Sequence, residues 1–96
     1  MKMKKYLSEG KIDYKGDALK DLPFFRSLTH DEKVIMIFAI KKMGDYAGVY
    51  PDMDTLPYFN ADFVLSCVLG SRRYLNPSGQ EIVGSLIDKF EAEGIV

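Results

Sequence analysis

The chain has 96 residues, enough for one hydrophobic core, so we expect a single domain over residues 1–96. Hydrophobic residues make up 47% and charged residues 28% of the sequence, a balance that argues against a mainly disordered chain. The net charge of −1 divides into +3 over residues 1–48 and −4 over residues 49–96, a bias so small that ordinary solvation explains it.

Cellular location is predicted from two further features. The longest apolar run, Val34 to Ile40, is too short to span a bilayer, and no apolar stretch of signal-peptide length follows the basic N-terminus. Cys67 is the only cysteine, so an internal disulfide is excluded. We therefore expect a cytoplasmic protein with no membrane association.

The N-terminal residues 1–16 are weakly patterned and allow either a small hairpin or a mobile basic terminus. Asp17 is suited to cap a short helix that ends before Pro23, since proline disfavours helical backbone at the preceding residue. Pro23 in turn favours a helical turn over Phe24-Phe25-Arg26.

The first long helix is predicted from Thr29 to the last-turn lysines that precede Gly44. Thr29 and Glu32 have the spacing of a capping box, in which each side chain accepts a hydrogen bond from the other residue's backbone amide. Gly44 fits a left-handed C-cap. Residues 34–40 are apolar on every face, so we expect this helix to lie at the centre of the core.

The connection from Gly44 to Phe59 is rich in turn-forming residues and predicts a loop with short turns, or a brief strand around Val49-Tyr50. Asn60 is a good cap for a second helix, although the β-branched residues that follow keep a strand as the alternative. Gly70 either ends this helix or lets it pack closely against a neighbour.

The clearest element is an amphipathic helix over Ser78–Glu93, which Gly94 ends. Asn76 and Pro77 suit its start, with a capping box of Ser78 and Glu81 as the alternative. Its core-facing stripe consists of Ile82, Val83, Leu86, Ile87 and Phe90. These elements predict a mainly α fold, a small domain of three to four helices with a short N-terminal hairpin as an optional addition.

Groups that carry catalytic or metal chemistry are scarce. His30 is the only histidine and Cys67 the only thiol, so the four ligands of a structural zinc site are lacking. Cys67 lies in an apolar stretch, which predicts a buried, inert thiol. His30 is predicted to be an exposed residue in the first turn of its helix. We therefore expect no enzyme activity, no metal, no cofactor and no small-molecule substrate.

The order of elements over residues 28–96 resembles a helix-turn-helix domain of the winged-helix type, as in phage and plasmid regulatory proteins, without a C-terminal wing. The resemblance rests on three stretches: Leu28–Lys33, Val49–Leu56, and Ser78–Val83 with the closing Phe90–Val96. It implies a recognition helix whose first residues, Ser78, Gly79 and Gln80, face bases. It also implies that Arg72 and Arg73 contact phosphates.

Two functional hypotheses follow. The first is a small binding module, an accessory or inhibitory protein of phage type, that acts through a partner protein or a second copy of the chain. Its candidate surface is the aromatic and Met-rich connection, namely Tyr46, Tyr50, Met53, Tyr58 and Phe59, unless these residues only seal the core.

The second hypothesis is a helix-turn-helix DNA-binding regulator. Its candidate residues are Arg72, Arg73, Ser78 and Gln80, with further charge from Lys2, Lys4 and Lys5. The last helix, however, carries four acidic residues against Lys89 alone, and an acidic face repels phosphates. We therefore rank a protein partner above DNA.

Overall fold

The fold is known from a computed structural model that describes residues 18–44 and 50–94. In chain order the elements of these residues are η1 (Leu19–Asp21), η2 (Pro23–Ser27), α2 (His30–Met43), η3 (Leu56–Tyr58), α3 (Ala61–Ser71), η4 (Arg72–Tyr74) and α4 (Pro77–Ala92). The η elements are short 3-10 helices. The prediction of a small, mainly helical fold is confirmed, and the described residues contain no β-strand beyond an isolated bridge between Ala18 and Asn60. The hairpin considered for residues 1–16 lies outside the described residues.

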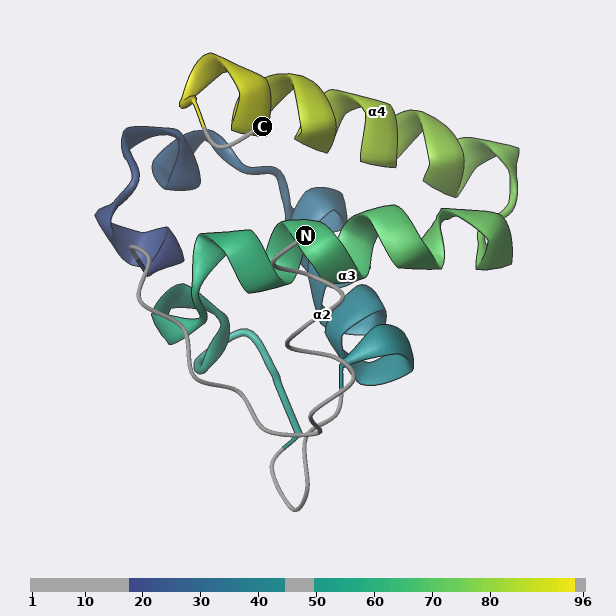
Figure 1. Cartoon of the computed structure of the whole chain (residues 1–96), viewed down its shortest axis with the longest axis horizontal. Helices are drawn as coiled ribbons and strands as arrows, with labels where there is room; N and C mark the ends of the chain where they lie inside the picture. Colours follow the sequence, from purple (N-terminus) through teal and green to yellow (C-terminus); the bar gives the residue numbers. More distant parts are fainter. Residues whose placement is uncertain (1–17, 45–49, 95–96) are drawn as a thin grey trace.

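The three long helices enclose the core (Figure 1). Helices α3 and α4 run in opposite directions across the view and are joined by η4, while α2 contacts both of them. Elements η1 and η2 lie beside the C-terminal end of α4. No helix in the described part of the chain is long and apolar enough to cross a membrane.

The three long helices start with the predicted capping chemistry, whereas η1 has Ala18 at its N-cap position and no side-chain cap; Asp17 lies outside the described residues. The Thr29 hydroxyl accepts a hydrogen bond from the Glu32 amide, and the Glu32 carboxylate accepts one from the Thr29 amide, which completes the capping box. The side chain of Asn60 caps α3 by accepting from the Asp62 amide. Asn76 caps α4, so the alternative box of Ser78 and Glu81 is not used.

The glycines that follow α4 and α2 have different backbone conformations. Gly94 has φ +78°, the left-handed conformation expected after the end of α4. The prediction of a left-handed cap at Gly44 is wrong, because Gly44 has an extended backbone with φ −83°. Its amide still donates to the carbonyl of Ile40, so the end of α2 is satisfied without a positive φ.

Helix α2 is less central than its composition suggests. Ile35, Met36, Ala39 and Ile40 are buried, but Val34 remains 43% exposed. We expected this helix at the centre of the core; α2 does contact both α3 and α4, but Val34 on one of its sides reaches the surface.

The remaining core follows the predicted stripe. Val83, Leu86 and Phe90 of α4 are fully buried, and Ile82 and Ile87 pack partly buried at its edge. The ring of Phe24 meets that of Phe90 edge-on, with centroids 5.2 Å apart. This contact fixes η2 against α4 and explains why Pro23 begins a buried turn.

Gly70 lies inside α3 rather than at its end. A Cβ atom at this position would lie 2.9 Å from the Cε atom of Met43, so the glycine permits the ends of α2 and α3 to approach closely. This close contact brings the last turn of α2 next to η4.

Candidate functional site

The segment from Tyr50 to Phe59, called here the tyrosine segment, is held by its own hydrogen bonds. The amide of Asp52 donates to the Thr55 hydroxyl (2.9 Å), and the amide of Thr55 donates to the Asp52 carboxylate (2.9 Å). The amide of Leu56 donates to the carbonyl of Asp52. These reciprocal bonds close a turn that leads directly into η3.

Two buried residues anchor the tyrosine segment to the core. Leu56 is fully buried, and the ring of Phe59 stacks on that of Phe63 with centroids 6.3 Å apart. The carbonyl of Phe59 also accepts a hydrogen bond from the amide of Leu19 (2.8 Å). The backbone around η3 is therefore fixed on both sides.

The five aromatic and Met residues proposed from the sequence as an interaction surface differ in their exposure. Tyr50 and Tyr58 are 80% and 70% exposed, and Met53 is half-buried. Phe59 is buried in the core and presents no surface, because Phe63 covers its ring. Tyr46 lies outside the described residues, as does Val49, and Tyr50 is not part of a strand. The exposed residues of the tyrosine segment are thus two tyrosines, Tyr50 and Tyr58, and two acidic residues, Asp52 and Asp54.

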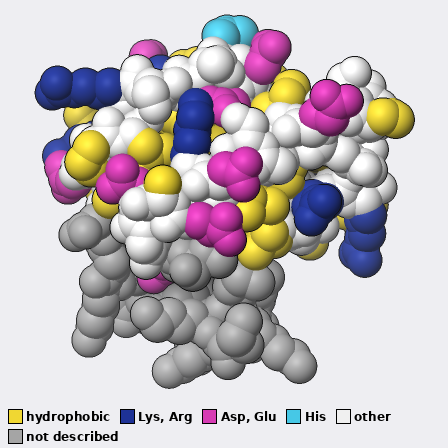
Figure 2. All heavy atoms as spheres, turned by 90° about the horizontal axis from the view of Figure 1, so that it is seen from above, with side chains coloured by type: hydrophobic (Ala, Val, Ile, Leu, Met, Phe, Trp, Pro, Cys, Tyr) yellow, Lys and Arg dark blue, Asp and Glu magenta, His cyan; other side chains and the backbone are white. Residues whose placement is uncertain are grey.

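A second exposed cluster lies where α2 ends and η4 begins. Lys42, Arg72, Arg73 and Tyr74, called here the basic corner, are all exposed. The Nζ atom of Lys42 lies 4.6 Å from the centroid of the Tyr74 ring, and the guanidinium carbon of Arg73 lies 5.0 Å from it. An Nη atom of Arg73 also donates to the Tyr74 hydroxyl (3.1 Å). Figure 2, which looks down on α4, shows Lys and Arg side chains at the right-hand end, where η4 joins α3 and α4 in Figure 1.

The three residues implied to face bases differ in the structure. Gly79 is buried, so it offers no surface to a base. The side-chain amide of Gln80 donates to the backbone carbonyls of Leu75 (3.1 Å) and Arg72 (3.4 Å), so it braces η4. Ser78 is exposed in the first turn of α4. Glu81 follows on the same turn, and Figure 2 shows acidic side chains distributed over this face.

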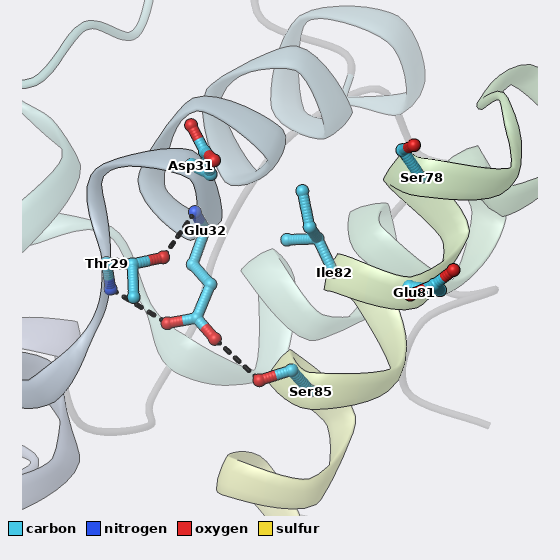
Figure 3. A pocket seen from close by; sticks show the side chains of 7 residues that line it. All are labelled: Thr29, Asp31, Glu32, Ser78, Glu81, Ile82 and Ser85. Carbon is cyan, nitrogen blue, oxygen red and sulfur yellow. Dashed lines mark hydrogen bonds between the residues drawn. The ribbon is translucent and has the colours of Figure 1, made fainter.

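An open groove of about 460 Å³ lies between the start of α2 and the first half of α4 (Figure 3). It is lined by Thr29, Asp31, Glu32, Ser78, Glu81, Ile82 and Ser85. The Ser85 hydroxyl donates to Oε2 of Glu32 (2.7 Å), and the ammonium of Lys89 donates to Oε1 (2.7 Å). Lys89 also donates to the carbonyl of Ser27 (3.1 Å). We call Glu32, Ser85 and Lys89 the polar clamp.

The polar clamp perturbs the titration of Glu32. Burial by itself would raise its pKa, since the side chain is almost completely inaccessible. Hydrogen bonds from Lys89, the Thr29 amide and Ser85, together with the charge of Lys89, outweigh burial and lower the pKa of Glu32 below its ordinary value. Glu32 is therefore an ionised structural group whose oxygens are already occupied.

Cys67 and His30 are the further groups that the sequence singled out for possible reactive or metal chemistry. Cys67 is buried, and burial raises the pKa of its thiol to about 12, so the nucleophilic thiolate is suppressed. His30 is exposed at the start of α2, as expected. The described residues contain no group of three or more His, Cys, Asp or Glu side chains that could hold a metal ion.

Comparison of the chain with the known protein families, with curated proteins and with solved structures finds no match. The resemblance to helix-turn-helix regulators therefore stays a prediction.

Sequence reasoning missed two participants in these surfaces. Tyr74 follows Arg72 and Arg73 directly, and that run of two cations and an aromatic residue was the available signal. Lys42 was read only as a favourable charge at the end of a helix. Its position beside Tyr74, 32 residues away in sequence, depends on the contact of Met43 with Gly70.

Proposed function

We propose that this domain is a non-enzymatic binding module that engages a partner protein through Tyr50 and Tyr58. The observation that carries the proposal is the exposure of two tyrosine rings, 80% and 70%, on a segment whose backbone is internally bonded and anchored. Tyrosine is one of the residue types that contribute most to protein interfaces, because its rigid side chain combines apolar area with a hydroxyl.

The rigidity of the tyrosine segment supports this proposal energetically. Association is opposed by the entropy lost when loops and side chains become ordered, about 0.5–1.5 kcal/mol for each flexible side chain. The turn of Asp52 and Thr55 and the anchors Leu56 and Phe59 order the segment before any partner binds. Tyr58, which lies between the anchors Leu56 and Phe59, therefore retains more of its contact energy for the interface.

Lys20 gives the surface an electrostatic preference. Its ammonium lies 5.9 Å from the centroid of the Tyr58 ring and 2.9 Å from a carboxylate oxygen of Asp21. The hydrogen bond that Lys20 donates to Asp21, together with the negative charge of Asp21, raises the pKa of Lys20, so this lysine stays protonated. A fitting partner presents an apolar pocket for the ring with a hydrogen-bond acceptor at its rim.

The test is site-specific photo-crosslinking in cells that express the full chain. A photoreactive phenylalanine analogue replaces Tyr58, and the matched control carries it at Tyr74, another exposed tyrosine on a different element. We expect a defined crosslinked protein from position 58 that is absent from position 74. Tyr50→Ala should weaken its affinity by about 30-fold, the effect of losing an interface residue worth about 2 kcal/mol.

A second copy of the chain is one form the partner can take. In that case the crosslinked species has twice the mass of the chain, and light scattering of the purified protein shows a dimer that Tyr50→Ala dissociates. The proposal fails if positions 58 and 74 give the same crosslinks, or if Tyr50→Ala leaves a specific crosslink unchanged.

The helix-turn-helix alternative has less support from the geometry. Gln80 already donates its amide to the backbone of η4, and Glu81 is exposed in the same turn of α4. A major-groove reader needs free amide or guanidinium groups at the start of its recognition helix. Sequence-specific duplex binding by α4 remains a prediction, tested by Ser78→Ala in a mobility-shift assay.

A further inference from the structure

The basic corner places two cations at one aromatic ring and a third, Arg72, next to them in the chain. Lys42 and Arg73 lie within 5.0 Å of the centroid of Tyr74, which is 47% exposed. Arg72 precedes them at the start of η4 and is exposed as well. None of the three cations forms an ion pair with a described residue, where the ion pairs observed are Lys20 with Asp21 and Lys89 with Glu32.

The backbone beneath the basic corner is fixed in place. The amide of Leu75 donates to the carbonyl of Arg72, which also accepts from the side chain of Gln80. The Leu75 side chain packs against Gly79, where a Cβ atom would lie 3.0 Å from that of Leu75. The exposed side chains of η4 therefore project from a turn whose backbone is held by hydrogen bonds.

We propose that the basic corner binds single-stranded nucleic acid, with Tyr74 stacking on a base while the three cations neutralise neighbouring phosphates. Proteins that bind single strands combine aromatic stacking platforms with cationic side chains, and guanidinium planes stack on bases as well. The surface is separate from the tyrosine segment, so the proposal extends beyond the proposed function and does not depend on it.

Single-stranded nucleic acid fits this corner better than a duplex does. The element that carries the cluster, η4, has three residues, whereas a major groove is read by a longer helix or a β-ribbon. The neighbouring helix α4 offers Glu81 rather than a cation next to Gln80. A flexible strand can place one base on Tyr74 and wrap its phosphates toward Lys42 and the arginines.

The test measures fluorescence anisotropy of a labelled oligothymidylate of about ten nucleotides with the full-length protein at low salt. Three phosphate contacts predict a slope of about −2 for the logarithm of the binding constant against the logarithm of salt concentration. Tyr74→Leu should weaken binding by about tenfold, the range that base stacking contributes, whereas Tyr74→Phe should retain it.

Charge variants provide the matched control. Arg73→Gln should weaken binding and make the salt slope less negative by about 0.7. Arg26→Gln removes the same charge from the exposed residue of η2 and should leave binding unchanged. Circular dichroism confirms that each variant remains folded.

The proposal is overturned if oligothymidylate does not bind, or if Tyr74→Leu binds as tightly as the parent. Equal loss of binding in Arg26→Gln and Arg73→Gln would also overturn it, since net charge alone would then explain the affinity. Stronger binding of polyglutamate would assign the corner to an acidic protein, and stronger binding of duplex DNA would assign it to a duplex. Either result counts against the proposal.

Discussion

Helix α2 packs against two helices with different chemistry. The buried residues of α2 and α3 are mostly apolar, among them Met36, Ala39 and Ile40 on α2 and Phe63, Val64 and Val68 on α3, and the two helices contact each other. Toward α4, buried apolar residues are accompanied by the polar clamp of Glu32, Ser85 and Lys89. Hydrophobic contacts are non-directional, whereas the hydrogen bonds of the polar clamp keep their geometry in only one position of α4 along α2. The first contact therefore supplies stability and the second supplies alignment.

The largest expected effect comes from placing a charge in the apolar part of the α4 contact. Leu86 is fully buried, so Leu86→Asp should lower the free energy of unfolding by more than about 4 kcal/mol and unfold the domain. Circular dichroism and urea titration measure the loss. Gly84→Ala on the same helix has open space around the new methyl group and should instead stabilise the domain slightly. A folded Leu86→Asp protein would contradict the assignment of α4 to the core.

A cavity in the contact between α2 and α3 should have the next largest effect. Met36 is fully buried, and Met36→Ala should cost about 2–5 kcal/mol of unfolding free energy. Val34→Ala on the same helix should cost less, because the Val34 side chain is partly exposed. Urea unfolding monitored by circular dichroism compares the two variants, and similar losses in both would refute the unequal burial of the two faces of α2.

Breaking the polar clamp should cost less than opening this cavity. Lys89→Ala leaves the buried carboxylate of Glu32 without its cation, and we expect a loss of about 2 kcal/mol because Lys89 itself is partly exposed to water. The double variant Glu32→Gln/Lys89→Met removes both charges and should be less destabilised than Lys89→Ala alone. A double variant that loses as much as the single variants combined would show that the two residues do not act as a pair.

The smallest effect is a dependence of stability on acid pH. Because the folded-state pKa of Glu32 is lowered, ionised Glu32 stabilises the domain above its unfolded pKa, near 4.5. That contribution is lost as the pH falls from about 4.5 through the folded pKa. In Glu32→Gln, the decline of the urea midpoint between pH 7 and pH 3 should be shallower than in the parent. Parallel curves for the two proteins would exclude Glu32 as a source of the acid sensitivity.

The helix boundaries were predictable because they depend on neighbours in sequence. Thr29 with Glu32, Asn60 with Asp62, and Asn76 with Gly79 each close a hydrogen bond over two or three residues. Their backbone geometry follows from local chemistry, whatever the rest of the chain does. The stripe on α4 was predictable for a similar reason, since its 3.6-residue period is a property of one helix.

The candidate surfaces were only partly predictable. Tyr58 and Phe59 are adjacent aromatic residues, yet Tyr58 is exposed and Phe59 is stacked on Phe63. The sequence predicts the same exposure for these two aromatic neighbours. Their different burial depends on the position of α3. The arginines of the basic corner were identified from the sequence and Tyr74 follows them directly, whereas Lys42 joins them through a contact between two helix ends.

By itself, the sequence determined that the chain forms a small helical domain, where its long helices begin, and which face of α4 is apolar. These properties arise from hydrogen bonds and periodicities that span a few residues. The tertiary structure decided that Glu32, a capping residue, is also the buried partner of Lys89. It also decided that Gly44 ends α2 with an extended backbone and that Lys42 joins Arg73 at the ring of Tyr74. Those outcomes depend on distances between segments far apart in the chain, which are set only when the helices pack.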